Sequence, residues 1–237
     1  MNLKQKSVIL DKAKTFFKEK IIGNHVKGIK GLVSPKNFKI NPFIQPYLAK
    51  LLCGDTSEES VARSLIYPRV LSTSISGIFG SQMQSFCSEV LEGFGSTTPG
   101  IDIEFIDQTD KRKKFCQLKA GPNTINSGDV ETILHKFISL KNLAKTNKVK
   151  ILQGDLVVGV LYGTDAELST HYKSIRNKHY IPVLVGNDFW IRLTGDKTFY
   201  TDLIKTFRDV SLSFGANDLI ESAVKELAQS LKCLKSD

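Results

Sequence analysis

Apolar and polar residues alternate along two neighbouring segments in the middle of the chain, residues 101–106 and 114–119. Such alternation is typical of β-strands with one buried face, and the polar run between the segments predicts a turn, so we expect a hairpin. The side chains predicted to face a core are Ile101, Ile103, Phe105, Cys116 and Leu118. The polar faces of the paired strands then hold Asp102, Glu104, Gln117 and Lys119.

Helical spacing of apolar residues predicts helices on both sides of this hairpin. We expect them at residues 3–22, 43–53, 57–66, 73–93, 128–145, 166–177, 198–211 and 217–234. Gly23-Asn24 is predicted to end the first helix, and an ordered loop is expected to follow it at 24–41. Further strands are expected at 154–162, 181–186 and 189–192. This order predicts an α/β (α+β) fold with a mixed central sheet flanked by helices.

The composition is that of an ordinary globular protein, with 237 residues of which 41% are hydrophobic. The longest apolar stretch, residues 156–162, is too short to cross a bilayer. The four cysteines lie far apart without a CxxC pair, which argues against a zinc site or a disulfide framework. We therefore expect a cytoplasmic protein without membrane contact. The sequence lacks a Gly-rich phosphate loop, so no nucleotide cofactor is expected either.

The positive charge is concentrated at the start of the chain. Residues 1–50 contain eleven lysines against Asp11 and Glu19, whereas the rest of the chain is balanced. Lysines that pair with phosphates bind nucleic acid without reading its sequence. The candidates for such contacts are Lys12, Lys14, Lys18 and Lys20. Two alternatives remain: a solvated helix face, or a dimer-forming arm whose apolar stripe of Val8, Phe16 and Phe17 packs on a partner.

Two short motifs resemble the active-site hairpin of the PD-(D/E)xK nuclease superfamily. Pro-Gly-Ile-Asp at 99–102 is similar to the first half-motif and Gln-Leu-Lys at 117–119 to the second. The segment 120–126 that follows, Ala-Gly-Pro-Asn-Thr-Ile-Asn, looks like the one that follows the catalytic lysine in certain type II restriction endonucleases. The resemblance covers residues 73–192. It divides the chain into a basic helical N-terminal region at 1–72, for DNA gripping or dimerisation, and a nuclease core with C-terminal helices at 73–237.

This resemblance implies a restriction-endonuclease-like fold and Mg²⁺-dependent, site-specific hydrolysis of double-stranded DNA, which leaves 5′-phosphate and 3′-hydroxyl ends. Asp102, Gln117 and the backbone carbonyl of Leu118 would be metal ligands, and Lys119 would orient or deprotonate the attacking water. The family usually has Asp or Glu where this chain has Gln117. A carboxamide brings no negative charge, so metal affinity should be lower unless Glu104 or another acid compensates.

Other residues have a functional and a structural interpretation side by side. Glu89, near the end of the helix before the hairpin, is either a further metal ligand or an ordinary surface glutamate. Asn123, Thr124 and Asn126 are candidates for contacts to DNA phosphates or base edges, and also for turn formation around Gly121-Pro122.

The two antiparallel strands of DNA favour a homodimer with one active site per strand and a nearly palindromic target. Two alternatives to a restriction enzyme stay open. One is a structure-specific repair or recombination nuclease, such as a junction resolvase. The other is a non-catalytic DNA-binding protein on a degenerate nuclease fold, which Gln117 makes worth keeping.

Overall fold

The computed structural model describes residues 2–91, 95–215 and 217–234. Its internal contacts divide the chain into two units, which we call the sheet unit (residues 1–16 and 80–208) and the helical unit (residues 17–79 and 209–237). The sequence places the boundary at residue 72. The contacts place it after Phe79 and assign residues 1–16 to the sheet unit. They also add the C-terminal helix α10 (Asn217–Leu234) to the helical unit, because it packs against α4 (Glu58–Pro68).

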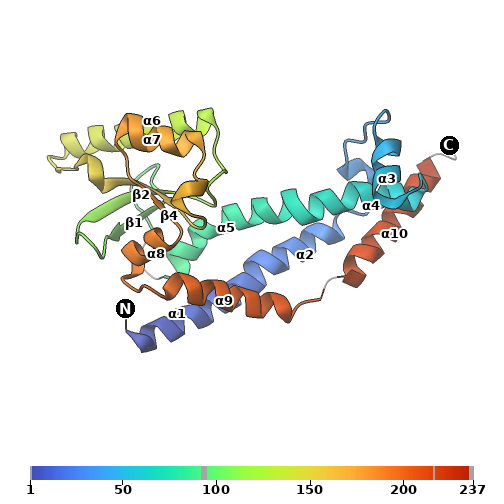
Figure 1. The fold of residues 1–237 in the computed structure, drawn as a ribbon, viewed down its shortest axis with the longest axis horizontal. Helices are drawn as coiled ribbons and strands as arrows, with labels where there is room; N and C mark the ends of the chain where they lie inside the picture. Colours follow the sequence, from blue (N-terminus) through green and yellow to red (C-terminus); the bar gives the residue numbers. More distant parts are fainter. Residues whose placement is uncertain (1, 92–94, 216, 235–237) are drawn as a thin grey trace. The chain divides into compact units, whose positions relative to one another are not determined.

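A four-stranded mixed sheet forms the centre of the sheet unit (Figure 1). Its strands, in spatial order, are β1 (Ile103–Ile106), β2 (Lys113–Lys119), β3 (Leu156–Val160) and β4 (Val183–Val185). The pair β1/β2 is antiparallel and is the predicted hairpin, whereas β2/β3 and β3/β4 are parallel. Parallel strands are covered on both faces, which explains why all five residues of β3 are apolar or glycine and buried. The predicted mixed α/β fold is confirmed.

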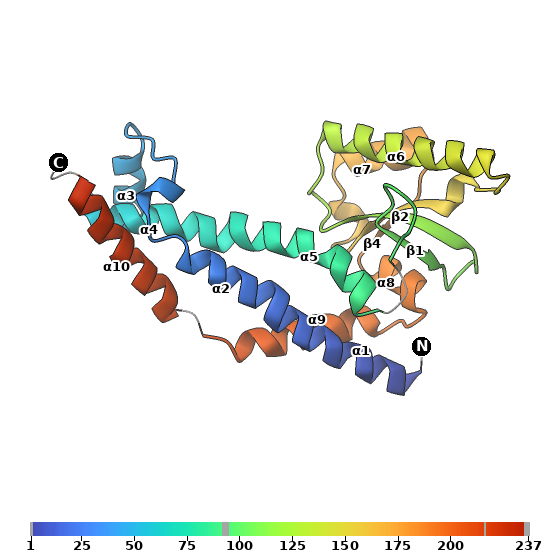
Figure 2. The same cartoon turned by 180° about the vertical axis from the view of Figure 1, so that it is seen from behind.

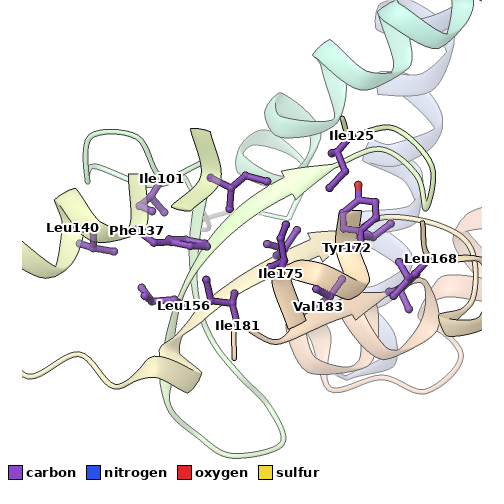
Figure 3. Packing of buried hydrophobic residues seen from close by; sticks show 14 residues of the cluster. Ile101, Ile125, Phe137, Leu140, Leu156, Leu168, Tyr172, Ile175, Ile181 and Val183 are labelled. Carbon is purple, nitrogen blue, oxygen red and sulfur yellow. The ribbon is translucent and has the colours of Figure 1, made fainter. Parts of the chain in front are cut away.

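Helices cover both faces of this sheet (Figures 1 and 2). The helices are α1 (Leu3–Phe16), α5 (Ile75–Glu89), α6 (Ser127–Thr146), α7 (Thr170–His179), α8 (Asn187–Thr194) and α9 (Phe199–Leu212), with short 3₁₀ turns η4 (Gln153–Asp155) and η5 (Asp165–Glu167). On one face, Phe137 of α6 and Tyr172 and Ile175 of α7 pack in one cluster with Leu156 of β3 and Val183 of β4 (Figure 3). On the other face, Phe189 of α8 lies over Gly159, where an added Cβ would come within 2.6 Å of its ring.

Residues 189–192 are not the predicted strand, because they lie within helix α8. A run of four residues, three of them apolar, is too short to distinguish a strand from a helix by periodicity. Phe189, Trp190 and Leu193 are the buried residues of this helix, and their spacing is helical. The indole Nε1 of Trp190 donates to the carbonyl of Leu161 over 2.8 Å, which anchors α8 beneath the end of β3.

The helical unit consists of helices around one apolar cluster. Its elements are η1 (Phe17–Ile22), α2 (Gly23–Lys30), η2 (Pro35–Asn37), α3 (Gln45–Cys53), α4 (Glu58–Pro68), η3 (Arg69–Ser74) and α10 (Asn217–Leu234). Ile29, Ile66 and Val224 are buried in the cluster. Ser57 caps α4 by accepting a hydrogen bond from the backbone N–H of Ser60 at 3.3 Å, so the predicted start of that helix is confirmed.

Two predicted helix ends are wrong. Gly23 does not end the first helix, which continues through η1 and α2 to Lys30. A glycine inside a helix costs about 1 kcal/mol, whereas burying an isoleucine contributes about 1.5–3 kcal/mol, and both Ile21 and Ile29 are buried. Similarly, α4 continues past residue 66 to Pro68, and the π-helical segment η3 then leads into α5. Residues 92–93 of the predicted helix at 73–93 lie outside the described residues.

Candidate functional site

A small polar cavity opens at the carboxyl end of β2, with a volume of about 230 Å³. Asp102, Gln117, Lys119 and Lys136 form its polar wall, and Met83 and Leu161 contribute apolar surface. Three of the four polar residues are predicted site residues. The structure therefore brings Asp102, Gln117 and Lys119 together, as the hairpin pattern predicted, and adds Lys136 from α6.

The hairpin register places Asp102 beside Gln117. Ile103 pairs with Cys116 in an antiparallel register. Asp102, the residue just before β1, therefore lies opposite Gln117 of β2. Asp102 donates its backbone N–H to the Cys116 carbonyl (3.1 Å), and its Oδ2 accepts the backbone N–H of Leu118 (2.8 Å). Burial raises the pKa of Asp102, and the Leu118 hydrogen bond and the charges of Lys136 and Lys119 offset this only in part. The carboxylate is thus fixed in place and poorly solvated.

Gln117 is buried, with 2% of its surface exposed, and both ends of its carboxamide are engaged. Its Nε2 donates to the Gly100 carbonyl (2.5 Å), and its Oε1 accepts a hydrogen bond from the Lys136 ammonium (3.1 Å). Sequence analysis missed Lys136. The available signal was its position three residues after Ile133 and four before Leu140, on the helix face that the apolar stripe turns toward the sheet.

Lys119 forms an ion pair with Asp129 at the start of α6, with 3.2 Å between Nζ and Oδ1. Asp129 and Asn126 also form a capping box, in which each side chain accepts the other's backbone N–H at 3.0 Å. Hydrogen bonds from Asn126 and Lys119 lower the pKa of Asp129 despite partial burial. Asp129 is a second residue that sequence analysis missed, and the Asn-x-x-Asp spacing could have revealed its capping role.

The two additional acids that sequence analysis considered as metal ligands lie elsewhere. Glu104 accepts hydrogen bonds from the hydroxyls of Ser96 and Thr98 (both 2.6 Å) and forms an ion pair with Lys113 (2.6 Å). Burial acts to raise the pKa of Glu104, but these contacts outweigh it and lower that pKa to about 2. Glu89 is exposed at the end of α5. Neither residue is among those that line the cavity in the described part of the chain.

The oxygen donors at the cavity fit a weakly held magnesium ion. Among residues 2–91, 95–215 and 217–234, no cluster of three or more His, Cys, Asp or Glu side chains is suited to hold a metal. The donors that remain are the Asp102 carboxylate, the Gln117 carboxamide oxygen and the Leu118 carbonyl. Lys119 O bonds to β3 and Cys116 O to β1, so strand alternation directs the Leu118 carbonyl to the β1 side, where Asp102 lies. Mg²⁺ prefers oxygen ligands and is commonly held by one or two carboxylates together with waters and substrate phosphates.

The candidate DNA-contacting residues after β2 are exposed, and two of them have structural roles. The hydroxyl of Thr124 donates to the Gly121 carbonyl over 2.8 Å, which closes the turn after Ala120. The side chain of Asn126 caps α6, as described above. Asn123 is exposed beside them. The turn interpretation of Thr124 and Asn126 is therefore correct, and contacts to DNA stay a prediction for all three residues.

The basic N-terminal segment contains both exposed and buried lysines. The four candidates for phosphate contacts are exposed: Lys12, Lys14, Lys18 and Lys20. Lys6 is buried instead and forms ion pairs with Asp202 (2.5 Å) and Asp196 (3.1 Å). Phe16 is also buried, with its ring 5.4 Å from that of Phe86 in an edge-to-face contact. An arm that offers Phe16 to a partner subunit is therefore excluded, because this side chain packs within its own chain.

Comparison with known proteins identifies one family. A family model described as type II restriction endonuclease EcoO109I matches residues 8–211, which include the hairpin, the cavity residues and most of the basic segment. No curated protein matches the chain. None of the helices in the described part of the chain has the length and apolar character needed to span a membrane.

Proposed function

Because this chain belongs to the family of the type II restriction endonuclease EcoO109I, we propose that it cuts double-stranded DNA at a short specific site in a Mg²⁺-dependent reaction. The observation that supports this most is the meeting of Asp102, Gln117 and Lys119 at one cavity. An acid, a neutral oxygen donor and a lysine at a strand end suit hydrolysis of a phosphodiester. The expected products have 5′-phosphate and 3′-hydroxyl ends.

We propose that the cavity is a variant PD-(D/E)xK site, in which the predicted site residues have the following roles. Asp102, Gln117 and the Leu118 carbonyl would hold magnesium, which would supply positive charge against the phosphate and make a bound water more acidic. Lys119 orients the attacking water or accepts its proton. Asp129 positions the Lys119 ammonium, because the two side chains form an ion pair at 3.2 Å.

We further propose that the enzyme is a homodimer that binds a nearly palindromic site. Two copies give two active sites for the two antiparallel DNA strands. Helix α3 and the residues before it expose a row of large apolar side chains, which supports an interface with a second copy: Phe43, Ile44, Tyr47, Leu51 and Leu52. Leu51→Glu should shift the protein toward a monomer in analytical ultracentrifugation. A monomeric parent protein that nicks one strand would contradict the proposal.

The test of the function is a digest of phage DNA with the purified protein and magnesium. Discrete bands that terminate at one sequence support a restriction endonuclease. Asp102→Asn protein, purified in parallel, controls for contaminating nucleases. A smear, or cutting confined to branched DNA, would indicate a repair or recombination nuclease instead. Intact DNA with retarded migration in a gel would indicate a non-catalytic DNA-binding protein, the alternative that Gln117 keeps open.

A further inference from the structure

Lys136 is held in the cavity by both its stem and its ammonium group. Nζ lies 3.1 Å from Oε1 of Gln117. The methylene stem crosses Gly100, where an added Cβ would lie only 3.3 Å from Cγ of Lys136. Gly100 also has a φ of +81°, a conformation that side-chain-bearing residues rarely adopt. The glycine of the Pro-Gly-Ile-Asp segment thus leaves room for this lysine to reach the cavity.

The two cavity lysines differ in their partners. Lys119 is paired with the carboxylate of Asp129. Lys136 donates to a neutral carboxamide, and no described residue provides a carboxylate within ion-pair distance of its ammonium. Asp102 is the sole acid among the described residues that line the cavity, and its Oδ2 already accepts the Leu118 N–H. The charge of Lys136 acts on Asp102 without forming an ion pair, so its ammonium can still bind another anion.

We propose that Lys136 is a second catalytic lysine, which binds an oxygen of the DNA phosphate at the cut site. This inference rests on the proposed nuclease function. It also gives a physical reason for Gln at position 117, where the PD-(D/E)xK superfamily that the hairpin resembles usually has an acid. A glutamate there would hold Lys136 in an ion pair, whereas the neutral carboxamide forms a weaker hydrogen bond that the ammonium can exchange for a phosphate.

The first test measures DNA binding without divalent cations at several salt concentrations. Lys136→Met keeps an unbranched stem over Gly100 and removes the charge. Its slope of log K against log salt should be shallower by about one unit, as expected when one phosphate is no longer bound. Lys145→Met is the matched control, because Lys145 is exposed in the last turn of the same helix. Its slope should stay that of the parent. Equal changes in both variants would overturn the proposal, since overall charge alone would then explain them.

The second test measures the single-turnover cleavage rate at saturating DNA and magnesium. Lys136→Met should be about 100-fold slower, as is typical when one charge-stabilising donor is removed from a reaction site. Lys136→Arg should keep the parent salt slope and most of the rate. If Lys136→Met is slow while its salt slope equals that of the parent, the lysine only orients Gln117, and the proposal is wrong. If the parent cuts DNA but Lys136→Met and Lys145→Met have the same salt slope and the same cleavage rate, the proposed role of Lys136 is wrong and the nuclease function still holds. A parent that neither binds nor cuts DNA refutes the function itself.

Discussion

Oδ2 of Asp102 accepts a hydrogen bond from the backbone N–H of Leu118 at 2.8 Å. This bond joins Asp102, the residue just before β1, to strand β2, which contains Gln117 and Lys119. Backbone groups do not depend on side-chain identity, so the position of the carboxylate is fixed by the hairpin itself. This hydrogen bond holds the carboxylate at the cavity beside Gln117 and Lys119.

Asp102→Asn should abolish cleavage and leave folding intact. The asparagine oxygen can still accept the Leu118 N–H, while the negative charge is lost. Because burial raises the pKa of Asp102, the ionised carboxylate is costly in the fold, and we expect the melting temperature of the variant to equal or exceed that of the parent. Cleavage assays, thermal unfolding and gel-shift binding would be measured together. A lower melting temperature with lost binding would assign Asp102 a structural role.

Lys119→Met should slow cleavage strongly while DNA binding persists. A positioned acid–base group typically contributes about 10²–10⁴-fold to a rate, so the single-turnover rate should decrease by a factor in that range. Asp129→Asn, which removes only the ion-pair partner of Lys119, should lose less activity and serves as the comparison. A larger loss in Asp129→Asn than in Lys119→Met would mean that the α6 cap, rather than the lysine, supports the reaction.

The hairpin and three of the four polar cavity residues could be predicted because their signals are local. Strand alternation depends on neighbouring residues, and the register of β1 and β2 then fixes Asp102 opposite Gln117. Lys136 could not be placed in this way. Its contact with Gln117 joins a helix to a strand across 19 residues. The apolar stripe places Lys136 on the sheet-facing side of α6 but does not show which strand residue it meets.

The same limit explains the wrong helix ends and the wrong strand. Gly23 has a poor helix propensity, but burial of Ile21 and Ile29 outweighs it, and burial depends on the whole fold. In α8, aromatic residues that favour strands form a helix because Phe189 fits over Gly159. Both outcomes follow from tertiary packing, which a single sequence specifies only indirectly.

The effect of Gln117→Glu on magnesium should depend on Lys136. The new carboxylate adds charge for the metal, but Lys136 can pair with it and compete. We therefore expect Gln117→Glu to lower the magnesium concentration for half-maximal cleavage more strongly in the Lys136→Met background than in the parent. The difference should be about fivefold, the equivalent of about 1 kcal/mol for a partly exposed ion pair. Equal shifts in both backgrounds would show that the two side chains act independently.

Asp155 should stabilise the fold at neutral pH and lose this effect in acid. It is buried and accepts two hydrogen bonds from Arg112, at 2.7 and 2.6 Å, and one from the Leu152 N–H. The Arg112 contact outweighs burial and lowers the pKa of Asp155 below its usual 3.8. Its stabilisation is thus present above that value and is lost as the pH falls through the folded pKa.

Asp155→Asn should therefore reduce the free energy of unfolding at pH 7 by about 1.5–3 kcal/mol, the range for hydrogen bonds to charged groups. Urea unfolding followed by circular dichroism at pH 7, 4 and 3 would measure the difference from the parent. It should shrink as the pH falls below 4. A difference that is the same at all three values would mean that the shape of the side chain, and not its charge, stabilises this end of β3.

The exposed N-terminal lysines should contribute to DNA affinity without selecting a sequence. Replacing Lys12, Lys14, Lys18 and Lys20 together by Gln should weaken binding to specific and non-specific DNA by similar factors. The slope of log K against log salt should become shallower by about one unit for each phosphate that is no longer bound, while the cleavage site stays the same. Fluorescence anisotropy at several salt concentrations, with both DNAs, would measure this.

A charge-matched variant separates direct phosphate binding from overall charge. Four other exposed lysines can be replaced in the same way: Lys145, Lys150, Lys173 and Lys178. If the N-terminal lysines touch phosphates, the matched variant should keep a steeper salt slope than the N-terminal variant, although four charges are removed from each. Identical slopes would support the alternative in which the N-terminal lysines form a solvated helix face. Because Phe16 is buried against Phe86, changed sedimentation of the N-terminal variant would not be expected under either interpretation.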